Sequence, residues 1–224
     1  MKVWFERREE LAPSIWQYYF RPERPVRFAP GQYVHVQLRH LMDDPRGPSR
    51  TFTLTSLPEE ELVSFVVKYI QPISTYKQAL EWLEPGDEAK IDDPMGDVIL
   101  PKSPRIPLVL VAGGIGIASF IGMIRQLTQK HEPRTIQLFY ALRHKSESIF
   151  LDDIQAYPFP IKRSLHIAPD RLQPDQVAAA VKPETLVYIS GSERFVEDMC
   201  ASLELRGVTH EQIIFDFFDG YADL

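Results

Sequence analysis

The sequence predicts an all-β unit followed by an α/β unit with a parallel sheet, and three observations support this fold class. In the N-terminal half, short stretches of alternating apolar and polar residues are separated by turn residues, as in antiparallel strands. In the C-terminal half, apolar strand-like runs alternate with helical periodicity, which indicates a parallel sheet wound on both faces. Between them, Pro101, Pro104 and Pro107 form a stiff connector. We therefore expect two domains, residues 1–102 and 103–224.

Composition and charge exclude several classes of protein. The chain has 224 residues, of which 44% are hydrophobic, enough for a proper core. No apolar run reaches the roughly 18 residues that span a bilayer, and residues 1–10 are too charged for a secretory signal, so we expect a cytoplasmic protein without a membrane segment. A net charge of -6 argues against a nucleic-acid partner. Cys200 is the single cysteine and the histidines lack ligand spacing, so we predict no metal site.

The strands of the first half are bounded by glycine, proline and acidic turns. A Pro30-Gly31 turn precedes the first of them, Ser74 stands at the N-cap position of a short helix at 75–83, and Pro85-Gly86 ends that helix. We expect strands at 33–38, 51–55, 62–70, 89–91 and 98–100.

The second half opens on a continuous apolar run at 107–112, the glycine turn G-G-I-G at 113–116 and a helix at 117–127. Glycines let bare backbone approach a ligand, and a phosphate would fit at the helix start. The third glycine of a full dinucleotide fingerprint is missing, so a turn that only packs the helix on the strand remains an alternative. We expect further strands at 135–141, 164–168, 185–190 and 212–217, and helices at 148–157, 174–181 and 193–206.

Five short motifs follow one another along the chain. They are F-A-P-G-Q-Y at 28–33, R-T-F-T at 50–53, D-P-M-G at 93–96, G-G-I-G at 113–116 and Y-I-S-G-S at 188–192. In this order they resemble the motifs of the ferredoxin-NADP reductase-like flavoproteins, and the resemblance covers nearly the whole chain. It implies an N-terminal antiparallel Greek-key β-barrel that binds flavin, followed by a Rossmann-like parallel-sheet domain that binds a nicotinamide nucleotide.

On the flavin side, the resemblance gives three residues distinct roles. Arg50 binds the flavin phosphate, Phe52 lies against the isoalloxazine face, and Thr53 hydrogen-bonds near N5, the atom that accepts hydride. A solvated loop arginine and ordinary strand alternation remain the alternatives. The other flavin-contacting residues that the resemblance implies are Thr51, Val66, Lys68, Ile73, Ser74 and Phe218.

On the nicotinamide side, the resemblance implies that Gly113, Gly114, Gly116 and Gly191 contact the nucleotide. Ser190 would lie beside the nicotinamide ring and Asp216 would approach the flavin, which with Thr53 completes the catalytic set. Some positions depart from the family pattern. They are Phe52 for tyrosine, Gln71 for glycine, Ala118-Ser119 for Thr-Pro and Ser190 for cysteine.

The expected activity is a flavin-dependent NAD(P)H oxidoreductase that uses FAD rather than FMN and passes electrons to an external acceptor, such as an iron-sulfur protein, a haem protein or a small oxidant. Two alternatives stay open: a reductase that releases reduced free flavin, and a binding module without turnover. Arg143 follows the second strand of the nucleotide domain, where an arginine accommodates the 2'-phosphate of NADPH, so we favour NADPH over NADH.

Overall fold

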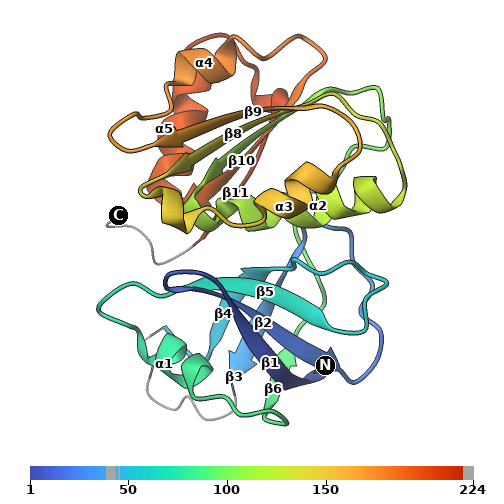
Figure 1. The fold of residues 1–224 in the computed structure, drawn as a ribbon, viewed down its shortest axis with the longest axis vertical. Helices are drawn as coiled ribbons and strands as arrows, with labels where there is room; N and C mark the ends of the chain where they lie inside the picture. The colour runs from blue at the N-terminus through green and yellow to red at the C-terminus, as the bar shows by residue number, and fades with distance from the viewer. Residues whose placement is uncertain (39–43, 45, 219–224) are drawn as a thin grey trace.

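The structure is a computed structural model, and it describes residues 1–38, 44 and 46–218. Figure 1 shows two units stacked on each other, the first from the N-terminal half of the chain and the second from the C-terminal half. Each unit has its own sheet, antiparallel in the first and parallel in the second, so the expected fold class is confirmed. The boundary expected at 102/103 lies in the segment between the two sheets and stays a prediction.

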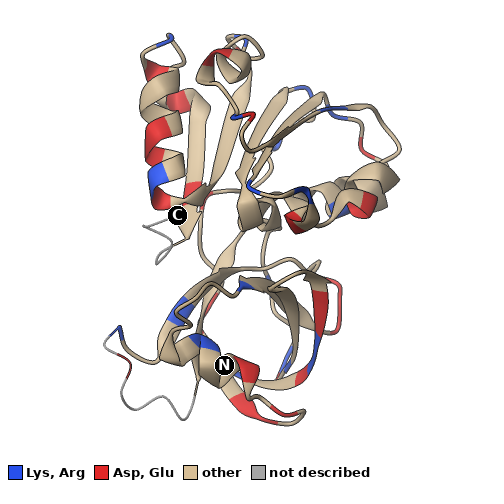
Figure 2. Ribbon diagram, turned by 60° about the vertical axis from the view of Figure 1, so that its left-hand side comes forward, with Lys and Arg blue, Asp and Glu red and all other residues tan. Residues whose placement is uncertain are grey.

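The first sheet has the strand order β4-β3-β6-β1-β2-β5. Its strands are β1 (Lys2–Ala12), β2 (Ile15–Pro22), β3 (Tyr33–Leu38), β4 (Ser49–Thr53), β5 (Val63–Lys68) and β6 (Glu88–Ile91). Seen from the side in Figure 2, these strands curve around into a barrel. The two end strands approach each other where Phe52 of β4 stacks on Phe65 of β5, with ring centroids 4.3 Å apart. A short helix, α1 (Thr75–Glu81), follows β5 and lies against the side of the barrel.

Two features of the barrel differ from the expectation. The long hairpin of β1 and β2 was not predicted, because β1 carries five consecutive charged residues at 6–10 and bulges beside Phe5 and Glu10 that interrupt its alternation. The strand expected at 98–100 is absent, since this segment is irregular and its neighbour Met95 forms only an isolated bridge to Tyr33. Val98 is nevertheless buried, where its carbonyl packs against Gly31.

The second sheet is parallel throughout its described strands and has the order β11-β10-β7-β8-β9. Its strands are β7 (Leu108–Gly113), β8 (Ile136–Leu142), β9 (Ile161–Ile167), β10 (Leu186–Ser192) and β11 (Ile213–Phe218). From β7 the chain winds outward to β8 and β9, then returns to β10 on the other side of β7. Parallel sheets of this kind bind ligands at the carboxyl ends of the strands, where the winding direction reverses.

Helices cover both faces of this sheet, as expected. After the 3-10 turn η1 (Gly114–Ile117), α2 (Ala118–Gln129) and α3 (Leu151–Ala156) cover the face toward the barrel; α4 (Pro174–Ala178) and α5 (Glu193–Glu204) cover the other face. Helix α3 is shorter than expected, because Ser148 is extended and Phe150 is left-handed (φ 60°), so the helix begins at Leu151; a separate 3-10 turn, η2 (Lys145–Glu147), precedes it. No helix among the described residues is long and apolar enough to cross a membrane.

Side chains join the two units closely. Arg125 of α2 donates hydrogen bonds to the Thr55 carbonyl of the barrel (3.0 Å) and to Asp153 of α3 (2.6 Å). Lys68 at the end of β5 forms an ion pair with Glu147 of η2 at 2.8 Å, with both side chains 15% exposed. These contacts fix the barrel against the carboxyl edge of the parallel sheet.

Candidate functional site

A cavity of about 790 Å³ lies at the carboxyl ends of the parallel strands. Its walls come from the glycine turn after β7, from the loops after β8 and β9, and from the start of α5. The barrel contributes Lys68, and β11 contributes Phe218. Members of the predicted site that line the cavity are Lys68, Gly113, Gly114, Arg143, Gly191 and Phe218. The cavity therefore runs from the loop after β8 to the barrel, as a site shared by two domains requires.

The glycines of the turn have different surroundings. Gly114 has φ +56°, and a β-carbon there would meet no atom within 4 Å, so its backbone faces open space in the cavity wall. At Gly116, a β-carbon would lie 2.1 Å from the Ser190 carbonyl oxygen of β10. At Gly113 and Gly191, it would lie 2.8 Å from the Phe195 ring. Gly114 is thus open to a ligand, whereas the other glycines permit close packing of the site itself.

Two of the three residues expected to act in catalysis, Thr53 and Asp216, meet across the two units. Thr53 is buried, and its hydroxyl donates to the Asp216 carboxylate at 3.3 Å across the domain interface. The hydroxyls of Ser190 and Ser119 share a hydrogen bond of 2.9 Å, also buried. Thr53 and Asp216 are therefore in contact. Ser190 is held by Ser119, which departs from the Thr-Pro of the family pattern.

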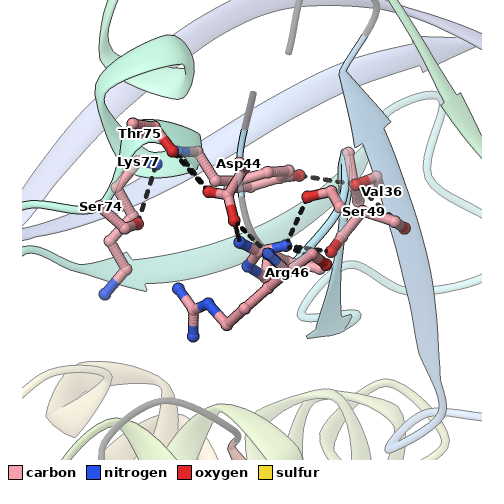
Figure 3. Close-up of polar contacts among 10 residues, drawn as sticks. Val36, Asp44, Arg46, Ser49, Ser74, Thr75 and Lys77 are labelled. Atoms are coloured by element: carbon pink, nitrogen blue, oxygen red, sulfur yellow. Dashed lines mark hydrogen bonds and ion pairs between the residues drawn. The ribbon is translucent and has the colours of Figure 1, made fainter. Parts of the chain in front are cut away.

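The expected phosphate ligand Arg50 forms hydrogen bonds within the protein, in the cluster around Asp44 that Figure 3 shows. Its Nη2 donates to Asp44 Oδ1 at 2.5 Å, and its Nη1 donates to the carbonyls of Arg46, Gly47 and Ser49 at 3.2, 2.9 and 2.6 Å. Its Nε is buried and has no hydrogen-bond partner among the described residues. The phosphate-binding role of Arg50 stays a prediction, and the ligand would have to share this guanidinium with Asp44.

Asp44 is a residue that the sequence did not point to. Its side chain is 3% exposed, and it accepts hydrogen bonds from the Thr75 hydroxyl (2.6 Å), the Tyr76 N–H (3.3 Å) and the Arg46 N–H (2.9 Å). Burial alone would raise the pKa of Asp44, but these bonds and the Arg50 guanidinium hold it well below its usual range. Asp44 is therefore a carboxylate anchored between Arg50 and the start of α1.

Two cationic side chains, Lys77 and Arg46, belong to the segments that bind the Asp44 carboxylate. Ser74 caps α1, as predicted, by accepting a hydrogen bond from the Lys77 N–H at 3.3 Å. The Lys77 ammonium donates to the Lys68 carbonyl at 2.6 Å. Burial, with the charges of Arg46 and Lys68 nearby, lowers the pKa of Lys77 to about 8. In Figure 3 the side chain of Arg46 extends away from Asp44 into the space below the cluster.

The remaining predicted flavin residues lie along β4, β5 and the segment before α1. Phe52 and Thr51 are partly buried on β4, and Phe52 also approaches Tyr76, with ring centroids 6.0 Å apart. Val66 is buried in the core shared with α2, and the half-buried Ile73 precedes the cap of α1. These positions are compatible with one extended ligand but leave its contacts as predictions.

The cavity is also lined by residues that sequence reasoning missed. Arg171 and Arg194 line it together with the predicted Arg143, and all three are exposed. His166 of β9 also lines it and is 8% exposed, and neither ring nitrogen has a hydrogen-bond partner among the described residues. No local motif distinguishes His166 in the sequence, because its place beside Ala141 arises from strand pairing.

Comparison with known proteins identifies the second unit and the whole fold. The sequence model of the family described as "Oxidoreductase NAD-binding domain" matches residues 110–201. The toluate 1,2-dioxygenase electron transfer component of Pseudomonas putida is 24% identical over 209 residues, covering 87% of this chain and 60% of that protein. The chain spans about 60% of the length of this relative and of two others that it matches over most of its own sequence.

Solved structures share the arrangement of both units. The Amycolatopsis cytochrome P450 reductase GcoB superposes with a TM-score of 0.81 at 20% identity, over 97% of this chain and 70% of that one. Ferredoxin-NADP+ reductase from Plasmodium falciparum superposes with a TM-score of 0.78 at 12% identity, over 97% and 95%. The chain therefore has the two-domain fold of ferredoxin-NADP+ reductase, and its residues 110–201 match the oxidoreductase NAD-binding domain.

Proposed function

We propose that this chain is an NAD(P)H-dependent flavoprotein reductase that holds FAD on the barrel and NADPH or NADH in the cavity. The observation that carries the proposal is the cavity itself, which begins at the NAD-binding domain's glycine turn and ends at Lys68 and Phe218 beside the barrel. Bound there, FAD would supply the two-electron acceptor for a nicotinamide hydride and the one-electron donor for an external acceptor.

The residues of the site position the two cofactors and do not react themselves. Gly114 leaves the cavity wall bare for a dinucleotide, and the paired hydroxyls of Ser119 and Ser190 fix the wall beside it. Thr53 and Asp216 form a polar contact at the domain junction, where a hydroxyl and a carboxylate can orient the reacting rings. Holding two rings in contact replaces a bimolecular encounter with an oriented one, and this lowers the activation barrier by a large amount.

The electron acceptor lies outside the described chain. The relatives named above are an electron transfer component of a dioxygenase and a cytochrome P450 reductase. We propose by analogy an iron-sulfur or haem protein as acceptor, in the cytoplasm.

A second candidate function is a free-flavin reductase, and the Asp44–Arg50 pair favours it specifically. A guanidinium already held by a buried carboxylate offers less to a flavin phosphate, so the flavin would exchange more readily.

One experiment separates the candidates. The purified protein is passed through gel filtration, its visible flavin absorbance is recorded, and NADPH or NADH oxidation is followed with ferricyanide, with and without added FAD. Retained flavin with turnover supports the reductase, and turnover that requires added flavin supports the free-flavin reductase. Protein that binds flavin or nucleotide but lacks turnover under both conditions would be a binding module and would overturn the proposal.

A further inference from the structure

We propose that Asp44 is a specificity-determining residue for the flavin: its carboxylate occupies the position of a flavin phosphate on Arg50, so that phosphorylated flavins bind only in competition with it. This inference rests on the proposed function, since it concerns how that site selects its flavin. If Asp44 competes in this way, the phosphate is the part of the flavin that the protein binds weakly. Flavin binding tests this without catalysis.

The contacts of Asp44 are those of a bound anion. One carboxylate oxygen accepts from the Arg50 guanidinium and the Arg46 N–H, and the other accepts from the Thr75 hydroxyl and the Tyr76 N–H. Guanidinium, hydroxyl and backbone N–H groups are also the donors that hold phosphate oxygens in proteins. With its carboxylate 3% exposed, Asp44 fills this set of donors from within the chain.

Arg50 has little left to offer a second anion. A phosphate is held by two adjacent nitrogens of the guanidinium. Here Nη2 is bonded to Asp44 and Nη1 to three carbonyls, and Nε, which has no partner among the described residues, is buried. The guanidinium also lies over the Tyr76 ring, 5.0 Å from its centroid, which fixes its plane. A phosphate therefore has to displace Asp44 rather than add to it.

Removing the charge of Asp44 while keeping its shape should release the site. In Asp44→Asn the amide oxygen can still accept a hydrogen bond, but the fixed negative charge is gone, and Arg50 with the nearby Lys77 and Arg46 then attracts a phosphate without competition. Charge-assisted bonds of this kind correspond to about tenfold or more in affinity. Riboflavin has the same ring system as FMN and FAD but no phosphate, so its affinity reports on the rest of the site.

The experiment is a titration of riboflavin, FMN and FAD into the full chain by flavin fluorescence. It compares wild type, Asp44→Asn and the matched control Asp97→Asn, which removes an exposed carboxylate away from Arg50. We expect Asp44→Asn to bind FMN and FAD about tenfold more tightly than wild type and riboflavin within about twofold, with the control unchanged. Circular dichroism checks that each variant is folded.

The outcomes discriminate clearly. Weaker or unchanged binding of FMN and FAD to folded Asp44→Asn would mean that the carboxylate orients Arg50 for the phosphate, and equal tightening of all three flavins would mean a general effect; either result overturns the proposal. Should the variant not fold, wild type alone decides: a preference for FMN over riboflavin within about tenfold supports competition, and a hundredfold or greater preference refutes it. Absence of binding of any flavin to folded protein would instead refute the proposed function.

Discussion

Arg143 lines the cavity in the loop after β8, and Arg171 and Arg194 line it as well. A permanently charged arginine here would contact the 2'-phosphate that distinguishes NADPH from NADH. We predict that Arg143→Ala raises the KM for NADPH about tenfold and leaves the KM for NADH nearly unchanged, and that the wild-type preference fades with salt. The control is Lys145→Ala, an exposed cation on the same loop. Equal losses for both nucleotides, or a wild-type preference for NADH at low salt, would contradict this assignment.

The lowered pKa of Lys77 makes a prediction about stability. Its pKa is about 8 in the folded chain and about 10.4 when unfolded, so between these pH values the unfolded chain binds more protons. The free energy of unfolding should therefore rise with pH across this window, relative to Lys77→Met, which has nothing to titrate. Urea denaturation of both proteins at pH 7.5 and at about pH 10 measures the difference. Parallel pH profiles for the two proteins would refute the buried environment of Lys77.

At the residue scale, candidate site residues were easier to predict from the sequence than their hydrogen-bond partners. Arg50, Thr53 and Gly114 were proposed from motifs; Gly114 lines the cavity, and the ligand contacts of all three stay predictions. The partner of Arg50 was not found, because no motif marks Asp44 in the sequence and two of its other partners, Thr75 and Tyr76, follow some 30 residues later. Such a contact depends on tertiary structure, which no local pattern encodes.

At the scale of elements, the turn after β7 joins strand, ligand and helix through glycines with separate purposes. We predict that Gly116→Ala loses about 3 kcal/mol of stability or does not fold, since the new β-carbon would lie 2.1 Å from the Ser190 carbonyl. Gly114→Ala should fold with a loss of about 1 kcal/mol, because φ is positive but space is open, and should raise the KM for the nicotinamide nucleotide. Thermal unfolding and steady-state kinetics measure both effects. Equal stability of the two variants would contradict the different packing described here.

Elements were predictable where one physical signal dominated. The apolar run of β7 and the period of α2 identified both, since each is buried on the sides that the pattern requires. Strand β1 was missed, because it is a long barrel strand whose middle is solvated and charged, so its identity comes from pairing with β2 rather than from alternation. The strand expected at 98–100 was wrong for the opposite reason: Val98 and Leu100 pack in the core that contains α2 without joining a sheet, and Ile99 is exposed.

At the scale of the whole molecule, the site exists only where the two domains meet, so their contact is part of the function. The Lys68–Glu147 ion pair spans this contact with little exposure. We predict that Glu147→Gln costs about 1 to 3 kcal/mol, and that a double-mutant cycle with Lys68→Met gives a coupling above about 0.5 kcal/mol. The exposed pair Arg7–Glu9 is the control, and Glu9→Gln should change stability by less than about 0.5 kcal/mol. Equal effects at the two sites would show that the domain contact does not rely on this pair.

The central claim is that nicotinamide and flavin meet in this cavity and exchange a hydride directly. The measurement that tests it most directly is anaerobic single-turnover mixing of the flavin-loaded chain with NADPH or NADH, either unlabelled or deuterated at the transferring position of C4. We predict rapid loss of the visible flavin absorbance, slowed by deuterium as direct transfer requires. Flavin-loaded protein whose absorbance is unchanged by either nucleotide would contradict the account.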